Sequence, residues 1–263
     1  MNVLIQISKT ISNFVWGPVM LILLVGTGVY LTFGLRGITI RKIGYAFKML
    51  FEGRDKTKQE GEGDITPFQA LMTSLAATVG TGNIAGVATA IFMGGPGAVF
   101  WMWITALFGM ATKYGEAVLA VKYREKKETG NFAGGPMYYI KNGMGDSWNW
   151  LGWAFALFAA VAAFGIGNTV QSNSVARAAE QSLNLPYWGT GLILSALTFI
   201  VIIGGIERIA EVTETLVPGM AIIYILGSIW IILVNVEELG GAFALIFNSA
   251  FTGHAAVGGF TGA

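Results

Sequence analysis

The chain has 263 residues, of which 54% are hydrophobic and 12% are charged, with a formal net charge of +1. Soluble domains are typically about 25% charged, so the composition excludes an ordinary soluble protein, and the near-neutral charge gives no sign of a nucleic-acid partner. The sequence has no cysteine, which excludes disulfides, thiolate chemistry and cysteine metal ligands. Its charges fall in short blocks between long apolar runs, because charge within hydrocarbon is costly. This pattern predicts an all-α, multi-pass integral membrane protein.

The first apolar run extends from about residue 11 to 34, and we expect it to remain as a membrane helix because the N-terminus lacks a signal-peptide pattern. Residues 36–53 come next, with apolar side chains at roughly helical spacing among basic residues. These apolar residues are Ile40, Ile43, Phe47, Leu50 and Phe51. The spacing predicts an amphipathic helix that lies on the inner leaflet.

A second charge-free run, 65–112, is too long for one membrane helix, which needs roughly 20 residues. The motif Gly94-Gly95-Pro96-Gly97 predicts a tight turn that divides it into segments two and three. We expect a structured loop over the glycine-rich stretch 131–145. Further spans are predicted at 150–176, between Pro186 and Glu207, at 215–236 with Pro218 in the first turn, and from Leu239 onward.

Basic residues predict the orientation of a membrane protein, because cytoplasmic loops are enriched in Lys and Arg. If each segment crosses once, 14 of the 16 basic residues lie on one side, and only Lys9 and Arg177 lie on the other. The 14 are Arg36, Arg41, Lys42, Lys48, Arg54, Lys56, Lys58, Lys113, Lys122, Arg124, Lys126, Lys127, Lys141 and Arg208. The prediction is therefore an external N-terminus, with these loops in the cytoplasm.

Segment two carries Ala-Ala-Thr-Val-Gly-Thr-Gly-Asn at 76–83, a poor sequence for an unbroken helix in the middle of a span. An unwound turn there would expose backbone groups that lipid cannot satisfy but that a bound carboxylate or cation can. The alternative is helix packing, because Gly82 and Gly86 form a GxxxG pair. This segment alone leaves both interpretations open.

Segment seven is also interrupted by glycine, within residues 248–259. Segments two and seven are five apart, and an odd number of crossings inverts a repeat across the membrane. Paired interrupted helices in corresponding positions indicate a transporter site. The spacing thus favours a binding site over packing, and makes segment one an extra helix before a five-plus-five core.

Segment four places three amides inside a predicted span, those of Asn168, Gln171 and Asn173. Asn168 shares a helix face with Gln171 and Ser172, whereas Asn173 points elsewhere. Hydrogen bonding between helices is one explanation. We favour contact between substrate and Gln171, together with at least one of its neighbours.

The remaining ionisable residues have simpler explanations. His254, the only histidine, is either a proton carrier or a polar lining residue. Glu116 lies three residues after Lys113, which predicts an ion pair on the helix surface. Glu207, Arg208, Glu211 and Glu214 predict a solvated cytoplasmic turn, with a gate salt bridge as an alternative.

The stretch SLAATVGTGNIAGVATAIFMGGPGAVFWMWITALFGMATKYGEAVLAVKYRE, followed by GGPMYYI, resembles the alanine or glycine:sodium symporter family. The resemblance covers essentially the whole chain and is strongest over 73–140. It implies the leucine-transporter fold of the amino acid–polyamine–organocation superfamily, a five-plus-five inverted repeat with one extra N-terminal helix. It also implies that this chain holds only the first half and the start of the second.

The resemblance implies these domains: 1–35, the extra transmembrane helix; 36–63, the cytoplasmic amphipathic segment; 64–236, the first five-helix repeat; and 237–263, the start of the second repeat. The sodium site of this fold usually has ligands from a later helix. We therefore expect that the chain does not transport by itself.

The resemblance also implies site residues. The substrate carboxylate would be held by Thr78, Gly80, Thr81, Gly82 and Asn83. Backbone carbonyls near Ala76 and Val79 would contribute to the sodium site. The rest of the pocket would be formed by Phe164, Gly165, Gly167, Gln171 and Asn173, and by Thr252 and Gly253 at the start of the second broken helix.

The predicted function is sodium-coupled symport of alanine or glycine by alternating access, in the plasma (inner) membrane. Na⁺ is the coupling ion, no other cofactor is expected, and the partners are a small amino acid, Na⁺ and the lipid bilayer. The alternatives are a proton-coupled amino-acid transporter, with His254 as the candidate carrier, or a polar-lined channel. We do not expect an enzyme, because hydrolase motifs such as HExxH and GxSxG do not occur.

Overall fold

The structure is a computed structural model. It describes residues 2–15, 17–52, 63–165, 167–253 and 255. The predictions for His254, for 256–259, and for Arg54, Lys56 and Lys58 therefore lie outside the described residues. The chain divides into two compact units. Unit one comprises Met1–Gly44, Val87–Val118 and Gly241–Ala263, and unit two comprises Tyr45–Gly86 and Leu119–Gly240.

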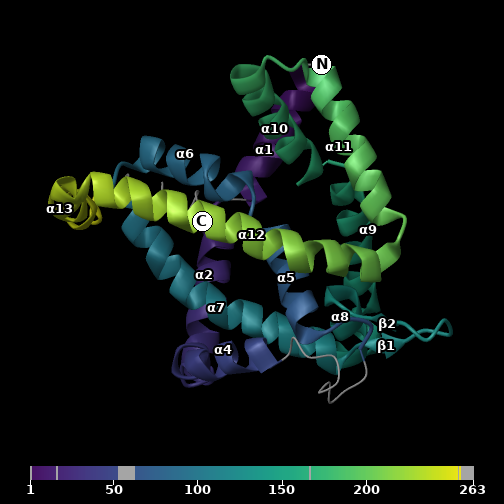
Figure 1. Cartoon of the computed structure of the whole chain (residues 1–263). Helices are drawn as coiled ribbons and strands as arrows, with labels where there is room; N and C mark the ends of the chain where they lie inside the picture. The colour runs from purple at the N-terminus through teal and green to yellow at the C-terminus, as the bar shows by residue number, and fades with distance from the viewer. Residues whose placement is uncertain (1, 16, 53–62, 166, 254, 256–263) are drawn as a thin grey trace. The chain divides into compact units, whose positions relative to one another are not determined.

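Both units consist mainly of helices (Figure 1). Unit one holds α1 (Asn2–Val15), α2 (Pro18–Gly34), α3 (Ile38–Arg41) and most of α6 (Ala85–Gly94), α7 (Ala98–Lys122) and α13 (Leu239–Ser249). Unit two holds most of α4 (Ile43–Glu52), with α5 (Pro67–Thr78), η2 (Thr81–Asn83), β1 (Glu125–Lys126), β2 (Phe132–Ala133), α8 (Pro136–Met144), η3 (Asp146–Trp148), α9 (Asn149–Ala163), α10 (Asn168–Leu183), α11 (Tyr187–Ile202), α12 (Gly205–Val234) and η4 (Val236–Glu238).

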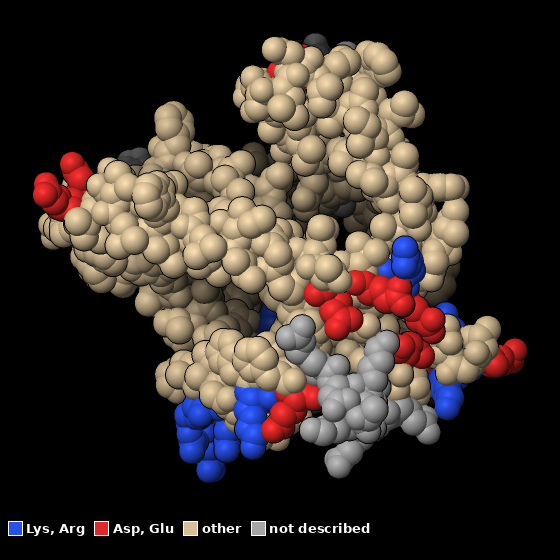
Figure 2. Space-filling view, viewed as in Figure 1, with Lys and Arg blue, Asp and Glu red and all other residues tan. Residues whose placement is uncertain are grey.

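Several helical stretches are long and apolar enough to cross a bilayer. These are Ile5–Gly34, Asp146–Leu183 and Gly205–Val234, and the bent pair Pro67–Thr78 and Thr81–Gly94 would make a fourth. α11 is a shorter apolar helix. On the face drawn in Figure 2, most of the surface is uncharged, as expected of a protein solvated by lipid.

Three of the seven predicted spans, those that contain α7, α11 and α13, are not among the stretches long and apolar enough to cross a bilayer. α7 has the length of a span but carries Lys113 and Glu116 toward its end, whereas α13 has only 11 residues. The prediction of seven crossings therefore extends beyond what helix length and composition establish.

Segment four differs from its prediction as one uninterrupted helix. α9 ends at Ala163 and α10 begins at Asn168, with Gly167 between them at φ +88°. That conformation lies in the region that favours glycine. The polar residues of segment four thus occupy the first turns of a new helix rather than the middle of a continuous one.

The predicted start of segment six was wrong by about three helical turns. α12 begins at Gly205, so Pro218 lies inside the helix rather than in its first turn, and Glu207 to Glu214 are helical rather than a turn. A proline inside a helix mainly costs the hydrogen bond to the carbonyl four residues earlier, which is that of Glu214. Membrane helices tolerate this loss when neighbouring groups compensate for it.

The predicted tight turn is confirmed, and the two segments predicted to lie on the cytoplasmic side contain regular structure. α6 ends at Gly94 and α7 begins at Ala98, with Gly95 at φ +73°. The region 36–53 forms two short helices, α3 and α4, rather than one. The stretch 131–145 contains β2, which pairs antiparallel with β1, and then α8.

The main contact of unit two joins α5 to α12. Phe68, Met72 and Val217 form a small buried cluster, against which Leu50 of α4 and Met220 pack. The apolar face of the amphipathic segment therefore contacts protein at Leu50. This contact positions α5, the helix that leads into the predicted break.

Candidate functional site

The predicted break in segment two is confirmed. α5 ends at Thr78, and Val79 and Gly80 are extended, with φ/ψ of −84°/112° and −157°/−161°. A short 3₁₀ turn, η2, comes before α6 begins at Ala85. The two helical pieces, Pro67–Thr78 and Thr81–Gly94, are bent by 63° at this point.

The start of α5 is fixed by a capping box. The Gln69 backbone N–H donates to Thr66 Oγ1, and the Thr66 backbone N–H donates to Gln69 Oε1, both at 3.1 Å. Pro67 occupies the first helical position, where its missing N–H costs nothing. The sequence T-P-F-Q at 66–69 has the capping-box pattern, and is therefore a local signal from which this helix start could have been predicted.

Asn83 shapes the break by taking a donor away from the helix. The Gly80 N–H donates to Asn83 Oδ1 at 2.8 Å, and the Asn83 N–H donates to the Gly80 carbonyl at 3.1 Å. In a continuous helix the Gly80 N–H would instead point to the carbonyl of Ala76. The Ala76 carbonyl therefore loses its helical donor, which suits the predicted role of a sodium ligand, because hard cations prefer oxygen.

Gln171 is the side chain that α10 brings to this break. An added Cβ on Gly80 would lie 2.6 Å from Gln171 Nε2 and 3.1 Å from Gln171 Oε1. Both residues belong to unit two. Two of the residues predicted for the substrate site are therefore adjacent, and the small size of Gly80 is what lets the amide approach the backbone.

The other polar residues at the start of α10 bond to backbone groups close to them in the sequence. Asn168 Nδ2 donates to the Ala163 carbonyl at 3.2 Å, and Asn168 Oδ1 accepts from the Thr169 N–H at 2.7 Å. Ser172 Oγ donates to the Asn168 carbonyl at 2.6 Å. Asn168 therefore links the first residue of α10 to the last residue of α9.

The remaining predicted residues of unit two are less closely grouped. Thr78 Oγ1 donates back to the Ser74 carbonyl at 2.8 Å, and Thr81, Gly82 and Asn83 form η2. Asn173 is exposed on α10, two residues beyond Gln171. Phe164, Gly165 and Gly167 lie at the α9–α10 interruption, where the Phe164 side chain is 86% exposed.

Gly82 and Gly86 have open space beside them in the part of the chain that the structure describes. An added Cβ would meet no described atom within 4 Å at either position. Within these residues the close approach at the break is therefore the one at Gly80, and the packing alternative for Gly82 and Gly86 stays a prediction.

Thr252 and Gly253 belong to unit one, after the end of α13. Thr252 Oγ1 donates to the Ser249 carbonyl at 2.9 Å, and the Thr252 N–H reaches the same carbonyl at 3.3 Å. The interruption predicted in segment seven therefore begins at Ala250, as far as the described residues extend.

A polar link between α5 and α12 was not predicted. Gln69 Nε2 donates to Glu214 Oε2 at 2.8 Å, and the hydroxyls of Thr73 and Thr213 are 3.1 Å apart. Gln69 is only 5% exposed. Sequence alone could not pair these residues, because they lie far apart along the chain.

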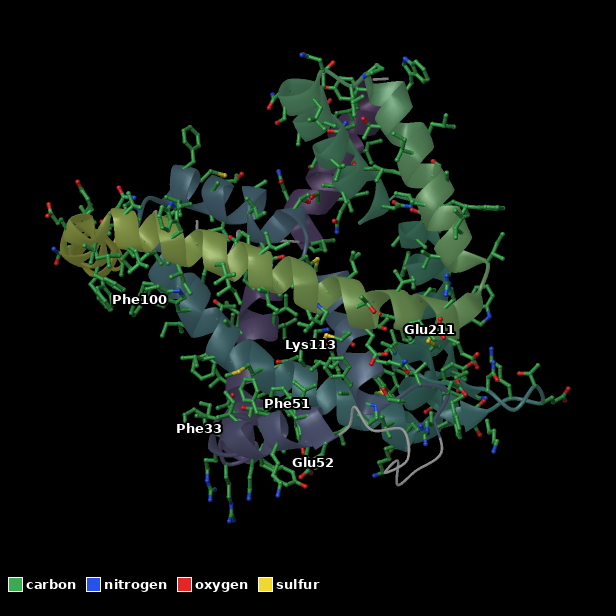
Figure 3. The ribbon with its side chains drawn as sticks, viewed as in Figure 1. Phe33, Phe51, Glu52, Phe100, Lys113 and Glu211 are labelled. Carbon is green, nitrogen blue, oxygen red and sulfur yellow. The ribbon has the colours of Figure 1, made fainter. Side chains whose placement is uncertain are left out.

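The ion pairs of α7 and α12 each lie within one helix. Lys113 Nζ and Glu116 Oε2 form the predicted ion pair at 2.7 Å. On α12, Arg208 pairs with Glu211 at 3.1 Å, and Figure 3 labels Glu211 near the first turns of that helix. The described residues contain no cluster of three or more His, Asp or Glu that could hold a metal ion. The hydrogen bonds described at the break are made by backbone groups, a hydroxyl and an amide.

Comparison with known proteins gives a consistent result. The model of the sodium:alanine symporter family matches residues 1–263. The sodium/alanine symporter AgcS of Methanococcus maripaludis is 51% identical over 98% of this chain and 57% of its own length. GlnT of Bacillus subtilis, described as a probable sodium/glutamine symporter, is 39% identical over 96% and 52%. The chain thus spans about half the length of the curated relatives it matches.

Proposed function

The chain belongs to the sodium:alanine symporter family, and from that premise we propose that it forms the first half of a sodium-coupled symporter for a small neutral amino acid, alanine or glycine. Transport proceeds by alternating access, within a leucine-transporter-like five-plus-five inverted repeat. The protein resides in the plasma (inner) membrane with its N-terminus outside. Its activity is that of a transporter rather than an enzyme.

The observation that carries the proposal is the break at Val79 and Gly80, with the Gln171 amide against it. In lipid, an interrupted hydrogen-bond ladder costs several kcal/mol for each unsatisfied group. Such a break persists where a ligand or neighbouring polar groups satisfy it. A zwitterionic amino acid and a cation together supply the complementary charges.

The roles of the site residues depend on the polarity of the backbone on each side of the break. The N-terminal end of the segment beyond the break offers N–H groups and positive dipole to a carboxylate, at Thr81, Gly82 and Asn83. The C-terminal end of α5 offers carbonyl oxygens, at Ala76 and Val79, to Na⁺. Gln171 orients the amino acid through its amide.

A small substrate agrees with the scarcity of space at Gly80, where an added Cβ would lie 2.6 Å from Gln171 Nε2. The relatives differ in the substrates of their names, alanine for AgcS and glutamine for GlnT. Substrate size is therefore the property to test first. A competition series of glycine, alanine, serine and glutamine against labelled alanine separates these possibilities.

The decisive experiment is uptake of radiolabelled alanine by the full-length protein in proteoliposomes, with Na⁺ and pH gradients imposed separately. An inward Na⁺ gradient should drive accumulation above the external concentration, and choline in place of Na⁺ should abolish it. Accumulation driven by a pH gradient in choline would establish the proton-coupled alternative. Rapid equilibration that no ion gradient can make concentrative would indicate a channel.

A further inference from the structure

The start of α7 lies directly against the end of α13, where the second interruption begins. Both segments belong to unit one. A Cβ added to Gly97 would overlap the carbonyl group of Ser249 and lie 2.6 Å from the Ala250 nitrogen. Ala98 and Ala250 are 0% exposed. Gly97 therefore permits a backbone approach that any other residue would prevent.

Trp101 lies one helical turn after Gly97 and on the same side of α7, because residues four apart align on a helix. Its indole Nε1–H donates to the Ala250 carbonyl at 2.5 Å. Ala250 comes directly after the last residue of α13, so its carbonyl is one of the groups that a helix end leaves without a helical donor. Trp101 supplies that donor from a different helix.

Aromatic rings surround this contact. The Phe100 ring lies 5.7 Å from the rings of both Phe247 and Phe251, and the Trp101 ring lies 6.4 Å from that of Phe251. Figure 3 labels Phe100 on α7. The pairs Phe100–Phe247 and Trp101–Phe251 are edge-to-face, and such pairs add to the stabilisation from buried area. One face of α7 thus contacts α13 on both sides of its terminus.

The hydrogen bond from Trp101 to Ala250 also bears on the residues next along the chain. A freed carbonyl in lipid is costly unless it finds a partner, and Trp101 satisfies the Ala250 carbonyl without occupying the residues beyond it. Thr252 and Gly253, which the resemblance to the symporter family implies as substrate-site residues, come two and three residues later. The position of Ala250 therefore determines where these residues lie.

We propose that Gly97 and Trp101 are positioning residues that hold the interruption after α13 in place, and thereby present Thr252 and Gly253 to the substrate. The expected effect on substrate binding rests on the proposed function. The positioning of the interruption by Gly97 and Trp101 does not depend on it. Gly97 acts by having no side chain, and Trp101 acts by donating one hydrogen bond. Neither residue needs to touch the substrate.

The test uses two measurements on the full-length protein. The first is the labelling rate of Gly253→Cys by a membrane-permeant maleimide, followed by mass spectrometry of the peptide that contains residue 253; a Cβ on Gly253 would meet no described atom within 4 Å. The second is the Kd for labelled alanine in Na⁺, measured without the cysteine. Trp101→Phe keeps an aromatic ring but removes the donor, and Gly97→Ala adds the obstructing carbon.

Trp101→Phe should accelerate labelling by about threefold or more, because the local structure opens more often. It should also raise the alanine Kd by about tenfold, as expected for a buried carbonyl left unpaired. Gly97→Ala should act in the same direction. The matched controls are Trp103→Phe, on the same helix with its ring 6.4 Å from Phe243, and Gly109→Ala, where an added Cβ has open space.

Labelling rates and Kd values of Trp101→Phe and Gly97→Ala that equal those of the controls would overturn the inference. A general loss of folding is recognised by size-exclusion chromatography. If labelling responds as expected while even the unsubstituted protein fails to bind alanine, the positioning role stands and the proposed function fails. The two hypotheses are thus tested separately.

Discussion

The side-chain amide of Gln171 lies against the backbone of Gly80, so close that a Cβ on Gly80 would sit 2.6 Å from Gln171 Nε2. One residue belongs to the break between α5 and η2, and the other to the second turn of α10. The sequence alone identifies Gly80 as a helix breaker. It identifies Gln171 only as one of several polar residues in a predicted span.

Gly80→Ala should abolish alanine uptake, because the added carbon overlaps the Gln171 amide and forces this flexible side chain away from the break. The melting temperature should change little, since only the far end of one side chain must move. Gly86→Ala is the matched control and should keep its uptake, since its added Cβ meets no described atom within 4 Å. Equal uptake by Gly80→Ala and Gly86→Ala would contradict the role of the contact.

Gln171→Ala by itself should weaken binding rather than folding. A hydrogen bond to a charged ligand group is worth about 1.5–3 kcal/mol, so the alanine Kd should rise by about 10- to 100-fold. The measurement is equilibrium binding of labelled alanine in saturating Na⁺. Ser174→Ala, on the same helix, should leave the Kd unchanged. An unaltered alanine Kd in Gln171→Ala would show that Gln171 does not bind the substrate and serves only in helix packing.

Glu214→Ala should destabilise the protein more than any exposed charge on the same helix. It leaves the amide of Gln69, a residue only 5% exposed, without its acceptor, at a cost of about 1–3 kcal/mol. Glu211→Gln removes an ion pair with Arg208 whose side chains are more than half exposed, and such pairs are worth about 0–1 kcal/mol. Melting temperatures measured by fluorescence-detected size exclusion compare the two; an equal shift would show that the α5–α12 link is unimportant.

The contact between β1 and α8 should resist mild acid. The hydrogen bond from Asn142, and then that from Lys141, lower the pKa of the Glu125 carboxyl below its ordinary value of 4.5. A lowered folded-state pKa gives stabilisation that is present above 4.5 and is lost as pH falls through the folded-state value. Hydrogen exchange of peptides from β1 and α8, corrected for intrinsic rates, should therefore be unchanged from pH 7 to pH 5.

Asn142→Ala supplies the control for this pH dependence. It removes the largest cause of the lowered pKa, so loosening of the β1–α8 contact should begin at a higher pH, closer to the ordinary value. Loosening of the unsubstituted protein between pH 7 and pH 6 would contradict the assignment to Glu125.

Local patterns predicted local structure well. The glycines and threonines of 76–83 predicted the break after Thr78, and Gly94-Gly95-Pro96-Gly97 predicted the turn before α7, because glycine and proline act on the backbone of their own residues. The spacing of Lys113 and Glu116 predicted their ion pair. Boundaries set by more distant contacts were harder, as shown by Pro218, which lies inside α12 because the helix starts at Gly205.

The amino-acid order by itself determined that the chain is apolar and helical and that segment two breaks near Gly80, and it predicted the interruption of segment seven, where α13 ends at Ser249. Each of these depends on composition, or on the dihedral freedom of neighbouring residues. Only the tertiary structure decided that Gln171, rather than Asn168 or Asn173, meets the first break, that Gln69 reaches Glu214, and that Trp101 meets Ala250. Such pairings depend on the rotation and approach of packed helices, which no local pattern encodes.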